Sequence, residues 1–261
     1  MIRSLYTAGT GMAAQQLEQD VVANNLANIN TVGFKKSRAD FQDLMYQIYT
    51  KSGAETTQGN QLPAGIEVGM GVKPISTEKI FTQGDYQQTG NQFDWAIEKS
   101  GFFQIDDNGN TYYTRAGNFK MDKDGVVVNS EGLKLIPNIT VPTGTVSFTM
   151  DSGGTWTAAD QAGTTLATGR LELAIFTNTA GLTSVGRNLY AKSESSGDAI
   201  TGNPGENGIG TVSQNFLEMS NVNVIDEMVK MIVGQRAYEI NSKAIQTADS
   251  MLSIINSLKR S

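Results

Sequence analysis

The sequence predicts an α+β protein, in which long N- and C-terminal helices pair as a coiled coil around an inserted central antiparallel β domain. Two observations predict this class. At both ends of the chain, apolar or small residues recur at alternating three- and four-residue spacing, which is typical of a helical seam. Between residues 50 and 220, Gly, Thr, Asn, Asp and Ser are dense and the β-prone runs are short, which favours β structure.

The N-terminal seam passes through Ile2, Leu5, Gly9, Met12, Gln16, Gln19, Ala23 and Leu26. We expect the helix to break near Asn30–Gly33, since Asn and Gly favour a helix end. A second, short helix is expected over residues 37–49, because Phe41, Leu44, Met45 and Ile48 recur at helical spacing.

The C-terminal helix is expected over residues 222–258. Asn221 or Asn223 can cap it, and Asp226 and Glu227 lie in the first turn, where negative charge suits the helix dipole. At ~1.5 Å per residue the helix is roughly 50 Å long, too long for a small β domain to cover. We therefore expect the two end helices to pack against each other.

The middle of the chain carries two strong hairpin signals. Asp107-Asn108-Gly109-Asn110 separates two β-prone runs, and Lys123-Asp124-Gly125 separates another two. The domain boundaries expected from these textures are 1–45 and 222–261 for a discontinuous helical assembly domain, 46–70 for an extended polar stretch, and 71–221 for the β-rich domain.

Composition argues against enzymes and small-molecule sites. The chain has no Cys and no His, so it lacks a thiol nucleophile, an imidazole base and the usual zinc ligands. We expect no catalytic residue, no metal and no cofactor. The net charge of −6 with no basic stripe disfavours nucleic acid. No apolar run is long enough for membrane insertion, and the N-terminus lacks the apolar core of a cleaved signal peptide.

The end helices favour self-assembly. Charged residues make up only 18% of the chain, as in a subunit that buries much of its surface against its own copies. Seam positions such as Gln16, Gln19 and Asn241 are polar, so a single helix pair is expected to be only marginally stable. We expect the ends to be mobile in a free monomer and to become ordered on assembly. Asn24, Asn25 and Asn28 have poor helix propensity and can fix register by hydrogen bonds to neighbouring helices.

Two long motifs then resemble one protein family. Residues 22–35, VANNLANINTVGFK, closely resemble the N-terminal signature of the bacterial flagellar rod and hook family. Residues 220–224, SNVNV, and 235–244, QRAYEINSKA, resemble the other end of the same family, and GFF at 101–103 and YTRAGNF at 113–119 resemble its β domain. The resemblance spans nearly the whole chain.

This resemblance implies a structural subunit of the flagellar basal body, in a rigid hollow tube that crosses the periplasm and transmits torque for motility. It implies export by the flagellar type III apparatus without a cleaved signal. The implied partners are further copies of the chain in a helical polymer, the proximal rod and hook subunits at its two ends, and the envelope ring proteins around it.

Within that family, the chain length and the polar stretch from Tyr46 to Pro63 favour the distal part of the rod. By pattern alone this stretch reads as a surface loop. The resemblance favours instead an arm that braces neighbouring subunits and stiffens the rod, and the residues expected to contribute to this role are Tyr46, Tyr49, Gly53, Leu62 and Pro63.

The expected assembly interface combines the seam and the motif residues. Its members are Leu5, Met12, Ala23, Asn24, Asn25, Leu26, Asn28, Gly33, Phe34, Asn221, Val222, Asn223, Met228, Gln235, Arg236, Tyr238, Asn241, Ala244, Ala248, Met251 and Ile255. Two alternatives stay open at this point. One is a proximal rod or hook subunit; the other is an envelope glycan-binding or glycan-cleaving module built on the β domain.

Overall fold

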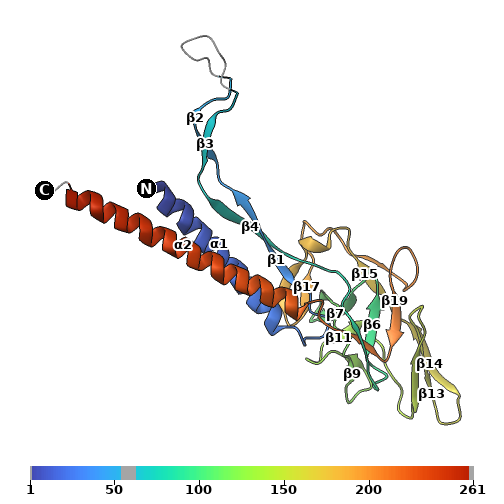
Figure 1. The fold of residues 1–261 in the computed structure, drawn as a ribbon. Helices are drawn as coiled ribbons and strands as arrows, with labels where there is room; N and C mark the ends of the chain where they lie inside the picture. The colour runs from blue at the N-terminus through green and yellow to red at the C-terminus, as the bar shows by residue number, and fades with distance from the viewer. Residues whose placement is uncertain (1, 54–62, 259–261) are drawn as a thin grey trace. The chain divides into compact units, whose positions relative to one another are not determined.

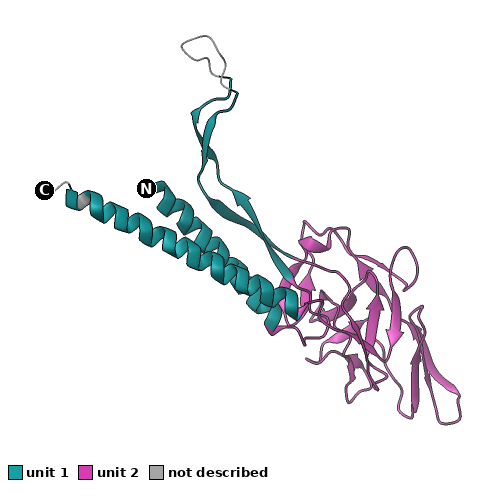
Figure 2. Cartoon of the chain, in the orientation of Figure 1, with its two compact units in different colours: residues 1–26, 37–78, 224–261 teal, residues 27–36, 79–223 magenta. Residues whose placement is uncertain are grey.

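The computed structural model describes residues 2–53 and 63–258 and divides the chain into two compact units (Figure 2). The helical unit comprises residues 1–26, 37–78 and 224–261, and the β unit comprises residues 27–36 and 79–223. Among the described residues, 27–36 therefore group with the β unit, and 37–53 and 63–78 group with the helices, although the sequence patterns placed 1–45 in one helical domain.

The helical unit is built on α1 (Ile2–Ala27) and α2 (Val224–Leu258), which lie side by side and antiparallel (Figure 1). Asn25 bonds to Glu227, and Gly11 lies against Asn241, so the paired residue numbers add to about 252. By this register α2 extends past the start of α1. The prediction that the two end helices pair is confirmed.

On α1, three buried residues lie one position before a predicted seam residue, and the fourth, Ala14, lies two positions after Met12. The buried α1 residues are Ala8, Ala14, Val22 and Asn25, whereas Gln16 and Ala23 are exposed. On α2, Ala248 is buried and Ala244 is exposed. Small side chains form much of the contact because they let two helices approach closely, so the larger side chains that mark the predicted stripe lie beside it.

The helix expected over residues 37–49 is wrong. This stretch forms strands β1 (Ser37–Asp43) and β2 (Tyr46–Thr50), which pair respectively with β4 (Val72–Lys79) and β3 (Ile66–Gly69). We call β1–β4 the ribbon. Pairing with the β-branched residues of β3 and β4 overrides the local helical spacing, as long-range partners often do for strands.

The base of the ribbon lies against α1. Gly71 has a φ of +113°, and a Cβ built there would be 2.2 Å from the Thr10 hydroxyl oxygen. That hydroxyl also accepts a hydrogen bond from the Val72 N–H at 3.4 Å. Further along, the Arg3 guanidinium lies over the Tyr49 ring at 5.1 Å. Glycine at position 71 is therefore what allows the close approach.

The β unit contains a seven-stranded antiparallel sheet, a three-stranded sheet and three strand pairs. The large sheet has the order β16 (Thr183–Gly186), β17 (Leu189–Ala191), β8 (Asn110–Thr114), β7 (Phe103–Asp107), β11 (Lys134–Ile136), β10 (Val127–Val128) and β9 (Lys120–Met121). The small sheet has the order β12 (Ser147–Met150), β13 (Thr155–Ala159) and β14 (Thr165–Arg170). The pairs are β15 (Leu173–Ile175) with β18 (Ile200–Gly202), β19 (Thr211–Gln214) with β6 (Trp95–Glu98), and β20 (Phe216–Glu218) with β5 (Tyr86–Gln88).

Both predicted hairpins are confirmed. Asp107 pairs with Asn110 across a turn in which Asn108 and Gly109 have φ values of 53° and 90°. Positive φ at both central positions is what the Asn-Gly signal requires. The second hairpin pairs Met121 of β9 with Val127 of β10.

The core of the β unit is rich in aromatic side chains. Trp95 and Phe103 are fully buried and Phe119 nearly so. The rings of Phe103 and Phe119 meet edge to face with centroids 5.1 Å apart, and Trp95 lies 5.2 Å from Phe119. These contacts give the β unit a core of its own, so the predicted inserted antiparallel β domain is confirmed.

Candidate assembly interface

Asn25, in the Asn-rich motif, is held inside the helical unit. Its side chain is 1% exposed. The Nδ2 group donates to the Ser37 carbonyl at 2.9 Å and to Glu227 Oε2 at 3.1 Å, while Oδ1 accepts from the Ser37 N–H at 2.8 Å. Lys230 pairs with the other oxygen of the buried Glu227 carboxylate at 2.7 Å. One amide thus joins the end of α1, the start of the ribbon and the first turn of α2.

Replacing Asn25 with Ala is expected to destabilise the helical unit by about 2 kcal/mol, because the Ser37 N–H and the Glu227 carboxylate lose buried partners. Denaturant unfolding followed by helical circular dichroism measures this. The control is Gln16→Ala, at an exposed position of the same helix, which should cost less than about 0.5 kcal/mol. Equal losses in the two variants would contradict the role given to the Asn25 amide.

The N-terminal motif continues into the β unit through Gly33, Phe34 and Lys35, all of which are buried. Gly33 has a φ of +69° and its N–H donates to the Glu218 carbonyl at 2.8 Å. Asn28 forms a local turn, since its side-chain oxygen accepts from the Thr31 hydroxyl at 3.2 Å. These motif residues therefore make contacts within their own unit.

A buried charge cluster lies beside this segment. Lys35 and Glu218 form an ion pair with both side chains fully buried, and Arg115, 3% exposed, reaches the other Glu218 oxygen at 3.4 Å. Lys35 also donates to the Thr82 carbonyl at 2.6 Å, and Arg115 to the Lys99 carbonyl at 2.6 Å. We call Lys35, Arg115 and Glu218 the charge cluster.

The electrostatics of the cluster follow from its burial. Burial lowers the pKa of Lys35, and the Glu218 carboxylate opposes that shift. Burial likewise lowers the pKa of Arg115, again opposed by Glu218. Burial, reinforced by the Glu218 charge, raises the pKa of nearby Tyr86 to about 12. The Glu218 carboxylate therefore favours the charged forms of both Lys35 and Arg115.

The charge cluster was not predicted from the sequence. Lys35 and Arg115 belong to two of the family motifs but were given no role there, and Glu218 was not predicted to have one. A partial signal was available, because Arg115 and Glu218 are each the sole charged residue of a short stretch, 111–119 and 214–220 respectively. What the sequence could not supply was their pairing, since Lys35 and Glu218 are 183 positions apart.

Asn221 does not cap α2. Its Oδ1 accepts from the Lys36 N–H at 2.8 Å, and its Nδ2 donates to the Ile80 carbonyl at 2.8 Å and to the Thr82 hydroxyl at 2.9 Å. It therefore joins three segments of the β unit. Val222 is also buried, and Asn223, immediately before α2, is exposed.

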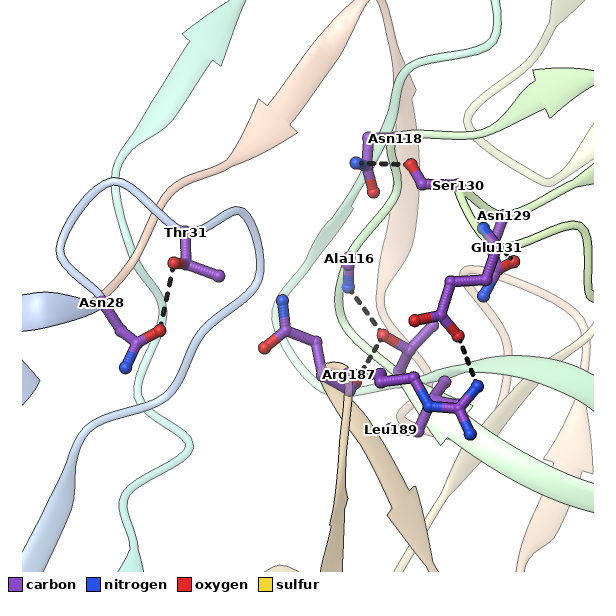
Figure 3. A pocket seen from close by; sticks show the side chains of 11 residues that line it. Asn28, Thr31, Ala116, Asn118, Asn129, Ser130, Glu131, Arg187 and Leu189 are labelled. Atoms are coloured by element: carbon purple, nitrogen blue, oxygen red, sulfur yellow. Dashed lines mark hydrogen bonds and ion pairs between the residues drawn. The ribbon is translucent and has the colours of Figure 1, made fainter. Parts of the chain in front are cut away.

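A polar cavity of about 360 Å³ lies in the β unit, and residues of the N-terminal motif (22–35) and of the segment 113–119 form part of its wall (Figure 3). Asn28 and Thr31 line it from one side, and Glu131 and Arg187 form an ion pair of 2.8 Å in its wall. Asn118 donates to Ser130 at 3.2 Å. The side chains in its wall largely bond to one another, and the charges of Glu131 and Arg187 compensate each other. We therefore assign the cavity no ligand. No group of three or more Asp or Glu side chains among the described residues could hold a metal ion.

Along α2 the expected interface residues divide between two faces. Ala248 is buried against α1 and Asn241 is half-buried. The exposed members are Met228, Gln235, Arg236, Tyr238, Ala244, Met251 and Ile255. On α1, Leu5, Met12 and Leu26 are half-buried, while Ala23 and Asn24 are exposed. None of the helices among the described residues is long and apolar enough to cross a membrane.

The outward face of α2 is unusually apolar. Ile225, Val229 and Ile232 are 72%, 54% and 56% exposed. Two positions after them come Glu227, Met231 and Gly234; Glu227 and Gly234 lie against α1, and Met231 is half-buried. Two positions correspond to ~200° around a helix, so this row lies opposite the α1 contact. Val233 is also exposed, at 61%. We call Ile225, Val229, Ile232 and Val233 the α2 row.

The ribbon also exposes large apolar side chains. Tyr46 and Tyr49 are 54% and 57% exposed, and Met45 is 86% exposed. Gly53 has a φ of +82° and Pro63 is exposed. Leu62 lies outside the described residues. A two-stranded ribbon with such a surface has little stability of its own in water, so its exposed side chains suit a covering partner.

Tyr190 gives the β unit a pH-dependent contribution. It is 3% exposed, and burial raises its pKa above the ordinary value of 10.0, with Arg115 opposing the shift. Because the folded-state pKa is the higher one, Tyr190 stabilises the fold fully below pH 10.0, and this contribution is lost as pH rises through the folded-state pKa.

Replacing Tyr190 with Phe is therefore expected to reduce the loss of stability above pH 10.0 relative to the wild type. Denaturant unfolding at a series of alkaline pH values measures it. The control is the same pair of chains compared at pH values below 10.0, where Tyr190 is protonated in both states and the difference in stability should stay constant. A Tyr190→Phe curve parallel to the wild type would refute the assignment.

The fold defines a class of protein with paired terminal helices and an inserted β domain, and its exposed apolar faces suit assembly. Three family models match this chain. They are the flagella basal body rod protein over residues 5–35, the flagellar hook protein FlgE/F/G D1 domain over 96–158, and the flagellar basal body rod FlgEFG protein C-terminal over 213–258.

Curated relatives extend the match over the full chain. The flagellar basal-body rod protein FlgG of Borreliella burgdorferi is 47% identical, with all of both chains covered. FlgG of Bacillus subtilis is 41% identical over all of both chains, and the hook-basal body complex protein FlhP of that organism is 28% identical over 99% of this chain and all of its own. The chain belongs to the flagellar basal-body rod and hook family and is most like FlgG, the structural subunit of the distal rod.

Proposed function

We propose that the chain polymerises through its helical unit into the rigid hollow tube of the flagellar distal rod, the shaft that transmits torque across the cell envelope. The observation that carries this proposal is the α2 row, because three of its apolar side chains stand on the face of α2 opposite α1 and the fourth, Val233, is exposed at the edge of that face. A monomer gains nothing from exposing them, whereas further copies of the chain can bury them.

The proposal assigns the chain a structural role without catalysis or cofactors. Its partners are other copies along the tube, proximal rod and hook subunits at the two ends, and envelope ring proteins around it. Export passes through the flagellar type III apparatus without a cleaved signal peptide. Asn25 contributes indirectly, since its amide fixes the helical unit that presents the α2 row.

A matched pair of substitutions tests polymerisation. Val229→Asp places a charge in the α2 row, where the side chain is 54% exposed, and should abolish tubes seen by electron microscopy while circular dichroism stays that of the wild type. The control, Val185→Asp, changes an equally apolar side chain 49% exposed in the β unit and should leave tubes intact. Tubes of normal length from Val229→Asp would sink the proposal.

We further propose that the ribbon stiffens the tube by bracing neighbouring copies. Its exposed apolar side chains support this role, and its attachment to α1 through Gly71 and Thr10 means that force on the ribbon reaches the helix.

Shortening the ribbon tests this role. Deleting residues 46–69 joins Met45 to Met70, and the existing hydrogen bond from the Leu44 N–H to the Gly71 carbonyl at 2.8 Å can close the shorter hairpin. Tubes should still form but should bend several-fold more easily, because the bracing contacts are lost. The curvature of tubes in electron micrographs measures this. Shortened chains whose tubes are as straight as the wild type would exclude a stiffening role.

One alternative is a proximal rod or hook subunit of the same family. The ribbon distinguishes it, since a hook subunit is expected to give a flexible tube with or without residues 46–69. The similarity to FlgG over the full chain favours the distal rod.

A further inference from the structure

α1 carries an apolar groove beside its N-terminus. Its cavity of about 540 Å³ is lined by Ile2, Leu5, Tyr6, Gly9, Thr10 and Ala13. Gly9 and Ala13 give it a shallow floor, and a Cβ added at Gly9 would meet no atom within 4 Å. The groove is therefore open to an incoming side chain and is not filled by the described part of the chain.

The α2 row has the complementary shape. Its residues are β-branched, so their side chains are stiff at the first torsion and project as fixed ridges. From Ile225 to Val233 the row extends ~12 Å along the helix, and from Ile2 to Ala13 the groove extends ~17 Å. Small residues facing large ones allow two helices to interdigitate closely.

The two surfaces cannot meet within one chain. The antiparallel register places the groove level with α2 residues 239–250, whereas the row begins at Ile225 on the same helix. The separation along the helix pair is roughly 24 Å. The charges at their ends also differ in sign, since Arg3 is the one charged residue among residues 2–13 and Asp226 adjoins the start of the row.

We propose that the α1 groove of one copy receives the α2 row of a second copy. The proposal rests on the polymerisation proposed above and names the surfaces that meet. Contact between two different patches is heterologous, and repetition of such a contact builds a ring or an open filament. Contact of the row with itself would instead close into a dimer.

Filling the groove tests the contact without disturbing the fold. Gly9→Leu replaces a helix-interior glycine where a Cβ meets nothing, so the monomer should keep or raise its melting temperature. The concentration needed for tube formation should rise at least tenfold. The control is Gln16→Leu, an exposed α1 position outside the groove, which should assemble as the wild type does.

A charge pair then identifies the partner surface. Gly9→Glu and Val229→Lys should each prevent assembly, and the double variant should restore it, because every contact then joins a Glu to a Lys. Normal tubes from Gly9→Leu, or a double variant that fails although both single variants are folded, would overturn the contact while leaving polymerisation standing. Absence of tubes from the wild-type chain would instead defeat polymerisation itself.

Discussion

Replacing Glu218 with Gln is expected to destabilise the β unit by about 3–5 kcal/mol, because two buried cations lose their shared carboxylate. Lys35 is fully buried and Arg115 is 3% exposed, so water cannot replace the lost charge. The measurement is the free energy of unfolding from denaturant titration, followed by the fluorescence of buried Trp95.

Lys35→Met should cost less, about 1–2 kcal/mol. It leaves Arg115 and Glu218 as a matched pair and removes a single set of Lys35 hydrogen bonds. The exposed control is Glu239→Gln, whose partner Arg236 is 76% exposed and whose loss should be below about 0.5 kcal/mol. If Lys35→Met destabilises more than Glu218→Gln, charge balance is not what holds the cluster.

The pH dependence gives an independent check on Glu218→Gln. Without the carboxylate, the pKa of Lys35 in the folded state falls further below the ordinary value of 10.5. Between the folded-state pKa of Lys35 and 10.5, the unfolded chain then binds more protons than the folded chain, so the free energy of unfolding rises with pH across this window. The deficit of the variant should therefore shrink as pH approaches 10.5, where Lys35 is neutral in the folded state. A constant deficit would contradict this explanation.

Local patterns in the sequence predicted the elements that local forces determine. The paired end helices follow from apolar spacing, and both hairpins follow from turn chemistry at Asn108-Gly109 and Asp124-Gly125. The residues of α1 that contact α2 could not be predicted as accurately, because Ala8 and Ala14 let the helices approach closely but bury little apolar area. The spacing of large apolar side chains therefore predicts the neighbouring face of the helix.

The ribbon and the charge cluster depend on distant partners. Phe41 and Ile48 fit a helical spacing, and only pairing with residues beyond position 65 makes them strand residues. Similarly, Asn25 reads as a residue that bonds to a neighbouring helix, and it does bond to Glu227 of α2, but within its own chain. The sequence predicted what Asn25 can do without predicting which helix would be its partner.

Gly33→Ala is expected to destabilise the β unit by about 3 kcal/mol or more, with two causes that can be separated. The first is backbone strain, since Gly33 has a φ of +69° and an L residue there costs of order 1 kcal/mol. The second is a steric clash, because the added Cβ would be 2.4 Å from the Ala116 nitrogen and 2.6 Å from the Arg115 carbonyl carbon. Both atoms are backbone, so neither can rotate away.

Gly132→Ala isolates the first cause. Gly132 has a φ of +84°, yet a Cβ there meets nothing within 4 Å, so this variant should lose about 1 kcal/mol from strain alone. The difference between the two variants then measures the clash. Denaturant unfolding of both chains gives it directly. Because the clash would push residues 33–35 away from 115–116, Gly33→Ala should also weaken the hydrogen bond from the Gly33 N–H to Glu218, which exchange of that amide hydrogen detects. Equal losses in the two variants, with unchanged exchange, would mean that the motif does not need the close approach that Gly33 permits.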